Sequence, residues 1–226
     1  MAFLLTWDGV GEKFYEAGVK NGVLFPMGTN GYEAGVAWNG LTSVSDNPEG
    51  ADATDIYADD IKYGTIRSAE KAKLSIEAYT YPDEFAECDG SVSVATGVYI
   101  GQQKRKAFGF VYTTTVFDDA GGEHEKIHIA YGCTAAPSQK QHQTINDSVD
   151  AMTFSWDVDT TPVSVAGYKP TATFEIDSRT ADETKLTSLK QILYGTAATT
   201  GSNPTEAVAA RLPLPNEIIS HFTTNG

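Results

Sequence analysis

Apolar and polar residues alternate with a period of two along several stretches of the chain. Successive side chains of a β-strand point to opposite faces, so this alternation predicts strands with one buried and one solvated face. The stretches that show it most clearly are Leu74–Tyr79, Lys126–Thr134, Met152–Asp159 and Ala172–Asp177. In the second stretch the apolar positions are Ile127, Ile129, Tyr131 and Cys133, which are expected to share one buried face.

A fifth stretch, Phe108–Phe117, is rich in β-branched and aromatic residues, which favour strands. The segment Asp118–Glu123 that follows is rich in Asp and Gly, so it predicts a turn that pairs this strand with Lys126–Ala135 as a hairpin. Together the strands predict an all-β fold, an antiparallel sandwich or barrel, in a single domain that spans residues 1–226.

One segment, at about 181–194, has a helical period. Thr180 and Glu183 have the spacing of a capping box, and Gly195 is placed to end the helix. The apolar stripe of this helix is expected to cover an open face of the sheet, and its members are Leu186, Leu189, Ile192 and Leu193. Asp83–Glu87 predicts a short helical turn. In the C-terminal segment, about 196–226, Asn203-Pro204 is a candidate helix start.

Residues 45–62 predict a long acidic loop. Loops of more than about 12–15 residues are uncommon inside a compact domain and are usually functional or disordered. The segment contains both acidic and apolar residues, and the candidates for a functional role are Asp46, Glu49, Asp52, Asp55, Ile56, Tyr57, Asp59, Asp60 and Ile61.

The composition narrows the classes of function. Hydrophobic residues make up 41% of the chain and charged residues 20%, which is typical of a soluble globular protein. A formal net charge of −14 disfavours tight binding to nucleic acid or to an anionic membrane. The two cysteines, Cys88 and Cys133, are predicted to be reduced thiols without a disulfide. The N-terminal residues lack the basic and long apolar regions of a signal peptide, so we expect folding in a cytoplasm.

No arrangement of residues points to catalysis. The acidic segment lacks the ligand spacing of an EF-hand, and His124 and His128 would lie about 13 Å apart along a strand. No nucleophile elbow or phosphate-binding glycine loop is present in the sequence. We therefore expect no catalytic residues, no metal, no cofactor and no enzymatic activity. The basic run Lys104-Arg105-Lys106 is expected to be a solvated turn or to pair with a neighbouring subunit.

The order of short motifs resembles the major tail tube protein of long-tailed, siphovirus-type bacteriophages. The motifs extend from about Trp7 to Pro215. They are Trp7–Glu12, Tyr15–Val19, Gly22–Pro26, Trp38–Leu41, Tyr57–Asp59, Ile61–Tyr63, Glu77–Phe85, Gly101–Gln103, Ser155-Trp156, Thr161–Val163, Lys169–Ala172 and Ile192–Gly195.

This resemblance implies a β-sandwich flanked by a helix, six copies in a ring, and rings stacked into a hollow tail tube that conducts DNA during ejection. It implies a virion protein assembled in the host cytoplasm, with the tape measure, tail-tip and tail terminator proteins as partners. The 45–62 segment would then be the inter-ring loop, mobile in the free subunit and ordered against the next ring. An acidic wall would keep DNA phosphates away from the lumen surface, and the candidate residues are Asp157, Asp159, Glu175 and Asp177.

A second interpretation stays open, that of an acidic β-sandwich of a virion or cell surface that binds a sugar or a protein. The two differ in solution behaviour, because a binding module should stay a small oligomer at any concentration. The sequence alone leaves open the ring size, the presence of a contractile sheath and the strands that line the lumen.

Overall fold

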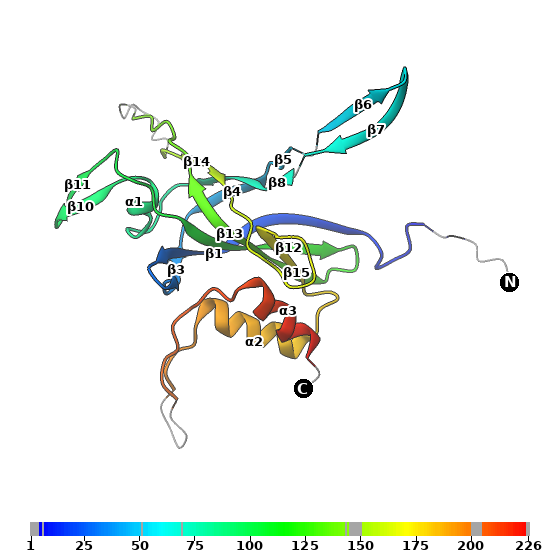
Figure 1. Cartoon of the computed structure of the whole chain (residues 1–226). Coiled ribbons are helices and arrows are strands. Elements are labelled where there is room, and N and C mark those ends of the chain that lie inside the picture. Colours follow the sequence, from blue (N-terminus) through cyan, green and yellow to red (C-terminus); the bar gives the residue numbers. More distant parts are fainter. Residues whose placement is uncertain are drawn as a thin grey trace.

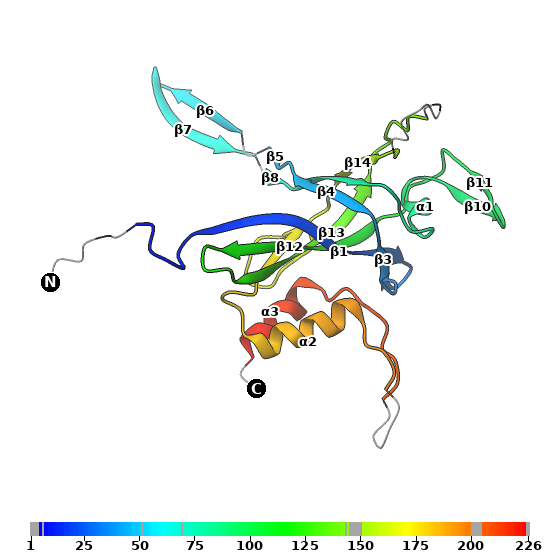
Figure 2. The ribbon, with the colours of Figure 1, turned by 180° about the vertical axis from the view of Figure 1, so that it is seen from behind.

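Two antiparallel sheets and a helical layer form the body of the protein (Figures 1 and 2). The computed structural model describes residues 5, 7–50, 52–68, 70–142, 144, 151–199 and 205–224. The middle layer, here called the central sheet, contains β1 (Phe14–Gly28), β3 (Val36–Trp38), β12 (Phe108–Asp118), β13 (Glu123–Ala135) and β15 (Thr173–Asp177). The outer sheet contains β4 (Leu41–Asp46), β9 (Lys73–Ala78) and β14 (Phe154–Asp159).

The strand pairs follow the sequence pattern closely. β12 and β13 form the predicted antiparallel hairpin, and the carboxylate of Asp118 accepts hydrogen bonds from the amides of Ala120 (2.9 Å) and Gly122 (2.6 Å) in its turn. β1 pairs with the other edge of β12, and the two-residue strand β2 (Gly31–Tyr32) folds back on the end of β1. The last residues of β13 pair with β14, which joins the two sheets. The predicted all-β antiparallel fold with a flanking helix is confirmed.

Two apolar cores result, one on each face of the central sheet. The core between the sheets is strongly aromatic: the rings of Trp38, Phe85 and Trp156 lie with centroids 4.5–5.6 Å apart. The core on the other face contains Ile127, Ile129 and Tyr131 of β13, apolar residues of β1, β12 and β15, and apolar residues of the C-terminal third of the chain. It comprises Val23, Phe25, Val111, Ile127, Ile129, Tyr131, Ile176, Leu186, Leu189, Leu193, Leu212 and Ile218.

Cys133 is buried as expected, but the prediction of its face is wrong. Ile127, Ile129 and Tyr131 pack against the helices, whereas Cys133 belongs to the core between the sheets. The cause is Gly132, which has φ of +58° and lies at a register shift between β12 and β13. A bulge adds one residue to the strand, so the alternation reverses after it.

Helix α2 (Glu183–Tyr194) covers the central sheet with Leu186, Leu189 and Leu193. The predicted cap at Thr180 is wrong by two positions: Asp182 caps this helix, and its carboxylate accepts a hydrogen bond from the amide of Lys185 at 2.9 Å. Asp is among the strongest N-cap residues, so it takes that position in place of Thr180. Gly195 ends the helix with φ of +74°, as expected.

The described residues contain two further helices. α1 (Phe85–Cys88) lies where a short helical turn was expected, and Phe85 and Cys88 are both buried. α3 (Pro215–Thr223) was not predicted; it begins with a proline and packs Ile218 into the helix-side core. The candidate helix start at Asn203-Pro204 lies outside the described residues.

The predicted loop at 45–62 is wrong, because the segment is strand. β4 runs to Asp46, and the chain continues as β5 (Glu49–Gly50), β6 (Ala53–Ala58), β7 (Ile61–Arg67) and β8 (Glu70–Lys71). β6 pairs with β7, and β5 with β8. Asp59 and Asp60 have φ of +51° and +59°, which is the conformation of a two-residue type I′ hairpin turn. A second two-stranded hairpin is formed by β10 (Val92–Ala95) and β11 (Val98–Ile100).

Candidate functional site

The β6–β7 hairpin, here called the protruding hairpin, extends away from both sheets (Figures 1 and 2). Its apolar side chains are 39–77% exposed and contribute to neither core. They are Ile56, Tyr57, Ile61, Tyr63 and Ile66. Two strands alone bury too little apolar surface for independent stability. This hairpin is therefore a candidate contact surface, and it contains most of the residues predicted for the inter-ring segment.

Those predicted residues do not all lie together. Asp55, Ile56, Tyr57 and Ile61 are on the protruding hairpin, with Asp59 and Asp60 at its tip. Asp52 lies just before β6. Asp46 ends β4 and Glu49 lies in β5, both below the base of the protruding hairpin. Asp55 is held by Lys62 at 2.7 Å and by the hydroxyl of Thr65 at 2.7 Å, which lowers the pKa of its carboxyl.

The outer sheet has one open polar face. The register places Ser45 beside Ser75, Ser75 beside Asp157, and Glu77 beside Ser155. Asp157 and Asp159 are exposed there, while Trp156 and Val158 on the same strand are buried in the core. Lys73 lies on the same face and contacts Asp159 at 3.5 Å and Glu49 at 2.9 Å, so the negative charge of this hydrophilic face comes mainly from Glu77 and Asp157. Two of the four residues predicted for an acidic wet face therefore lie on it.

Two strand edges border this open face. β4 pairs with β9 on one side and, within the described residues, has no strand on the other. β14 pairs along its length with β9, but only Val158 and Asp159 also pair with β13. The amide of Ala136 also donates to the carbonyl of Asp157 at 2.7 Å, so among the described residues the open part of this edge runs from Phe154 to Trp156. Open edges are templates for pairing with another chain.

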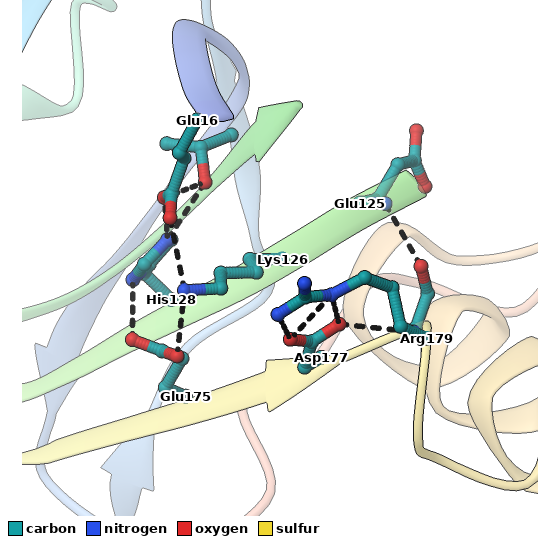
Figure 3. A network of polar contacts seen from close by, with 9 residues as sticks. Glu16, Glu125, Lys126, His128, Glu175, Asp177 and Arg179 are labelled. Atoms are coloured by element: carbon teal, nitrogen blue, oxygen red, sulfur yellow. Dashed lines mark hydrogen bonds and ion pairs between the residues drawn. The ribbon is translucent and has the colours of Figure 1, made fainter. Parts of the chain in front are cut away.

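Glu175 and Asp177 lie elsewhere, in a network of ion pairs on the central sheet (Figure 3). Lys126 lies between Glu16 (2.9 Å) and Glu175 (3.1 Å), joining β1, β13 and β15. His128 lies between the same two carboxylates, at 3.4 Å from Glu16 and 3.9 Å from Glu175. Its ring stacks on Tyr112 with centroids 4.6 Å apart. His128, Tyr112 and Glu175 line a cleft of about 210 Å³ between the two sheets.

The charges in this network are largely neutralised. The side-chain hydrogen bond from Arg179 lowers the pKa of the Asp177 carboxyl. Burial works to raise the pKa of Glu16, but hydrogen bonds from Thr114 and Lys126 outweigh it, so the pKa lies below its usual value. A carboxylate paired with Lys or Arg contributes little free negative charge to a surface. Glu175 therefore connects β15 to β13, and Asp177 holds Arg179 just after β15. Of the four candidates for an acidic lumen face, only Asp157 and Asp159 lie on the open face of the outer sheet.

The sequence contained a signal for this network that was missed. Lys126 and His128 alternate with Ile127 and Ile129 on β13, which placed them together on one side of the strand. Their partners come from β1 and β15, which are remote in sequence, so only the strand order brings them together.

Several other candidates have structural roles within the chain. Arg105 pairs with Asp89 at 3.2 Å, and Lys106 contacts Glu33 and Glu87 at 3.5 and 3.1 Å, so this basic run has partners in its own subunit. Cys88 and Cys133 are free and buried, and burial raises the pKa of both thiols, that of Cys88 to about 12.

Two classes of site are not seen in the described part of the chain. No cluster of three or more His, Cys, Asp or Glu side chains there has the geometry to hold a metal ion. No helix among the described residues is long and apolar enough to span a membrane.

Comparison with known proteins gives a likeness in structure but none in sequence. No family model matches the chain, and no curated protein matches it. Among solved structures, it is similar to a chain of the cryo-EM structure of the anti-feeding prophage baseplate, six-fold symmetrised, with 7% sequence identity and a TM-score of 0.38. The match covers 76% of this chain and 97% of that chain. At this TM-score the likeness supports no conclusion about function.

Proposed function

We propose that this protein is the structural subunit of a phage tail tube, in which rings of six copies stack into a hollow conduit for DNA. The observation that carries the proposal is the open polar face of the outer sheet, bordered on both sides by open strand edges. Both faces of the central sheet are covered, one by the outer sheet and one by the helices. The outer sheet is thus the layer that is available to line a lumen.

Ring closure would use the two edges of the outer sheet. Pairing β4 of one subunit with the open edge of β14 in the next is a heterologous contact, which closes into a ring at a suitable rotation. The side chains that then face the lumen would be Ser45, Ser75, Glu77, Asp157 and Asp159 and their neighbours. The negative charge of Glu77 and Asp157 would keep DNA phosphates from adhering to the wall, whereas that of Asp159 is offset by Lys73.

Stacking of the rings would use the protruding hairpin. Its exposed apolar residues contribute no free energy of burial in an isolated subunit, whereas a neighbouring ring could remove them from water. Tape measure, tail-tip and tail terminator proteins would be the partners at the inside and the two ends of such a tube. The motif order along the chain supports this assignment, and the fold has the sandwich and flanking helix that it requires.

The first test is assembly. We expect negative-stain micrographs and native mass spectrometry of concentrated protein to show rings of six subunits or hollow tubes. A subunit that stays monomeric at every concentration and under crowding would refute the proposal and favour the surface binding module.

The lumen assignment has a separate test. We expect Asp157→Lys tubes to retain short double-stranded DNA at low salt and to release it at high salt, because lysines on the wall attract phosphate. Glu206→Lys is the matched control, since Glu206 is exposed on the segment that follows α2. If both variants, or neither, retain DNA, then the face with Asp157 does not line the lumen.

A further inference from the structure

The β10–β11 hairpin, here called the uncharged ribbon, has features that the proposed tube does not explain. Its two strands pair only with each other in the described part of the chain, so both outer edges are open. Every residue of both strands is exposed. The exposed fractions of the large apolar side chains are 38–56%, and these residues are Val92, Val94, Val98, Tyr99 and Ile100.

The ribbon also lacks the charges that normally protect open strands. No charged residue and no proline occurs from Gly90 to Gln103, although the chain has a net charge of −14. The protruding hairpin is equally exposed but contains Asp55, Asp59, Asp60, Lys62 and Arg67. Natural proteins place charges and prolines on open strands to prevent pairing with other chains. Their absence from the ribbon indicates that its edge is normally covered by another strand.

A second exposed segment lies at the opposite end of the molecule. The N-terminal arm, residues 5 and 7–13, extends beyond β1 on the side of the protruding hairpin, whereas the ribbon lies at the other end (Figures 1 and 2). Leu5, Trp7 and Val10 in this arm are 72%, 77% and 89% exposed. No backbone amide of residues 5 and 7–10 donates a hydrogen bond to a described residue. The arm therefore has both free backbone groups and free apolar side chains.

We propose that the N-terminal arm of one copy adds as a third strand to the uncharged ribbon of a second copy. In β-strand addition, backbone hydrogen bonds supply affinity and alternate side chains supply specificity. The arm and the ribbon lie at opposite ends of one subunit, so a copy cannot pair its own arm with its own ribbon. The contact is head-to-tail and repeats along a stack.

Charge supports this pairing. Two copies with net charge −14 repel each other, and this repulsion is smallest where one surface has no charge. The ribbon offers such a surface. The described part of the arm brings the apolar side chains of Leu5, Trp7 and Val10 to it, and its charged residues, Asp8, Glu12 and Lys13, sum to a net charge of only −1. The contact requires only two copies in head-to-tail order, so it holds or fails independently of a ring of six.

A photo-crosslinker at position 99 tests the contact in the full chain. With p-benzoylphenylalanine in place of Tyr99, irradiated assemblies should yield dimers in which mass spectrometry finds residue 99 joined to residues 1–13 of another chain. The same group at Tyr168, which is 72% exposed and lies beside Phe174 of β15 and Ile219 of α3, should give no such product. Crosslinks from position 99 to the protruding hairpin, to the β4 edge or only within one chain would overturn the proposal.

A peptide tests the same contact without any tube. A synthetic peptide of residues 1–13, added in excess to dilute full-length protein, should slow amide hydrogen exchange several-fold at residues 92–100. Val94→Lys with Val98→Lys should abolish this protection, because lysines on the ribbon place charge at the pairing edge. Val94→Thr with Val98→Thr should retain it, because threonine is β-branched and uncharged. If the peptide leaves exchange at residues 92–100 unchanged, the proposal fails, even where the protein forms tubes.

Discussion

Removing the protruding hairpin separates folding from assembly. β5 and β8 already pair, Glu49 with Lys71 and Gly50 with Glu70, so their ends are close enough for a short connection. Replacing residues 51–69 with a four-residue Gly/Ser linker would remove β6 and β7 and keep this base. We expect a soluble, folded subunit that forms no long tubes.

The expected change in stability is small and favourable. None of the hairpin's apolar side chains belongs to either core, so their loss removes no buried surface from the body. Shortening the connection from 19 residues to four lowers the entropy cost of closing it by about 1 kcal/mol. The hairpin itself is two-stranded and contributes close to nothing by its own formation. The free energy of unfolding should therefore stay within about 1 kcal/mol of the parent value, or rise by that amount.

Urea unfolding followed by fluorescence measures the free energy of unfolding. Electron microscopy and sedimentation measure the formation of tubes. A matched control replaces Tyr57 and Ile61 with Ser in the intact hairpin, which keeps its length and removes part of its apolar surface. We expect shorter or fewer tubes for this control. If the shortened variant polymerises as well as the parent, the hairpin is not the contact between rings. If it loses several kcal/mol of stability, the hairpin packs on the body and the geometry described above is wrong.

Three further predictions concern the body of the protein. Gly132→Ala should lower the free energy of unfolding, measured in urea, by more than about 2 kcal/mol. The φ of Gly132 is +58°, and the new Cβ would lie 2.4 Å from the carbonyl oxygen of Thr161. Glu125→Gln should lower the free energy of unfolding by about 0.5–1 kcal/mol at neutral pH and leave it unchanged near pH 3. The side-chain hydrogen bond from Lys190 lowers the pKa of Glu125 in the folded protein. The stabilisation is therefore complete above the usual pKa of Glu and is lost as the pH falls through the lowered value. Cys88 and Cys133 should resist alkylation in the folded protein and react fully in denaturant without a reductant, as intact mass will show; protection that only a reductant removes would indicate a disulfide.

Local patterns were sufficient to predict most strands and the main helix. Alternation of apolar residues at Leu74–Ala78 and Phe154–Val158 reflects a strand that buries one face, and that requirement acts on neighbouring residues of one segment. Leu186, Leu189 and Leu193 recur at helical spacing for the same reason. The type of each element, and which of its residues are buried, can thus be read from the sequence.

Tertiary structure decided where each face points. Alternation alone placed Cys133 with Ile127, and only the bulge at Gly132 moves it to the other core. Asp157 and Glu175 both alternate with buried residues, but Asp157 lies on an open face whereas Glu175 is paired within the central sheet. Alternation along a strand shows that its two faces differ. What packs against each face depends on the order of strands that are remote in sequence.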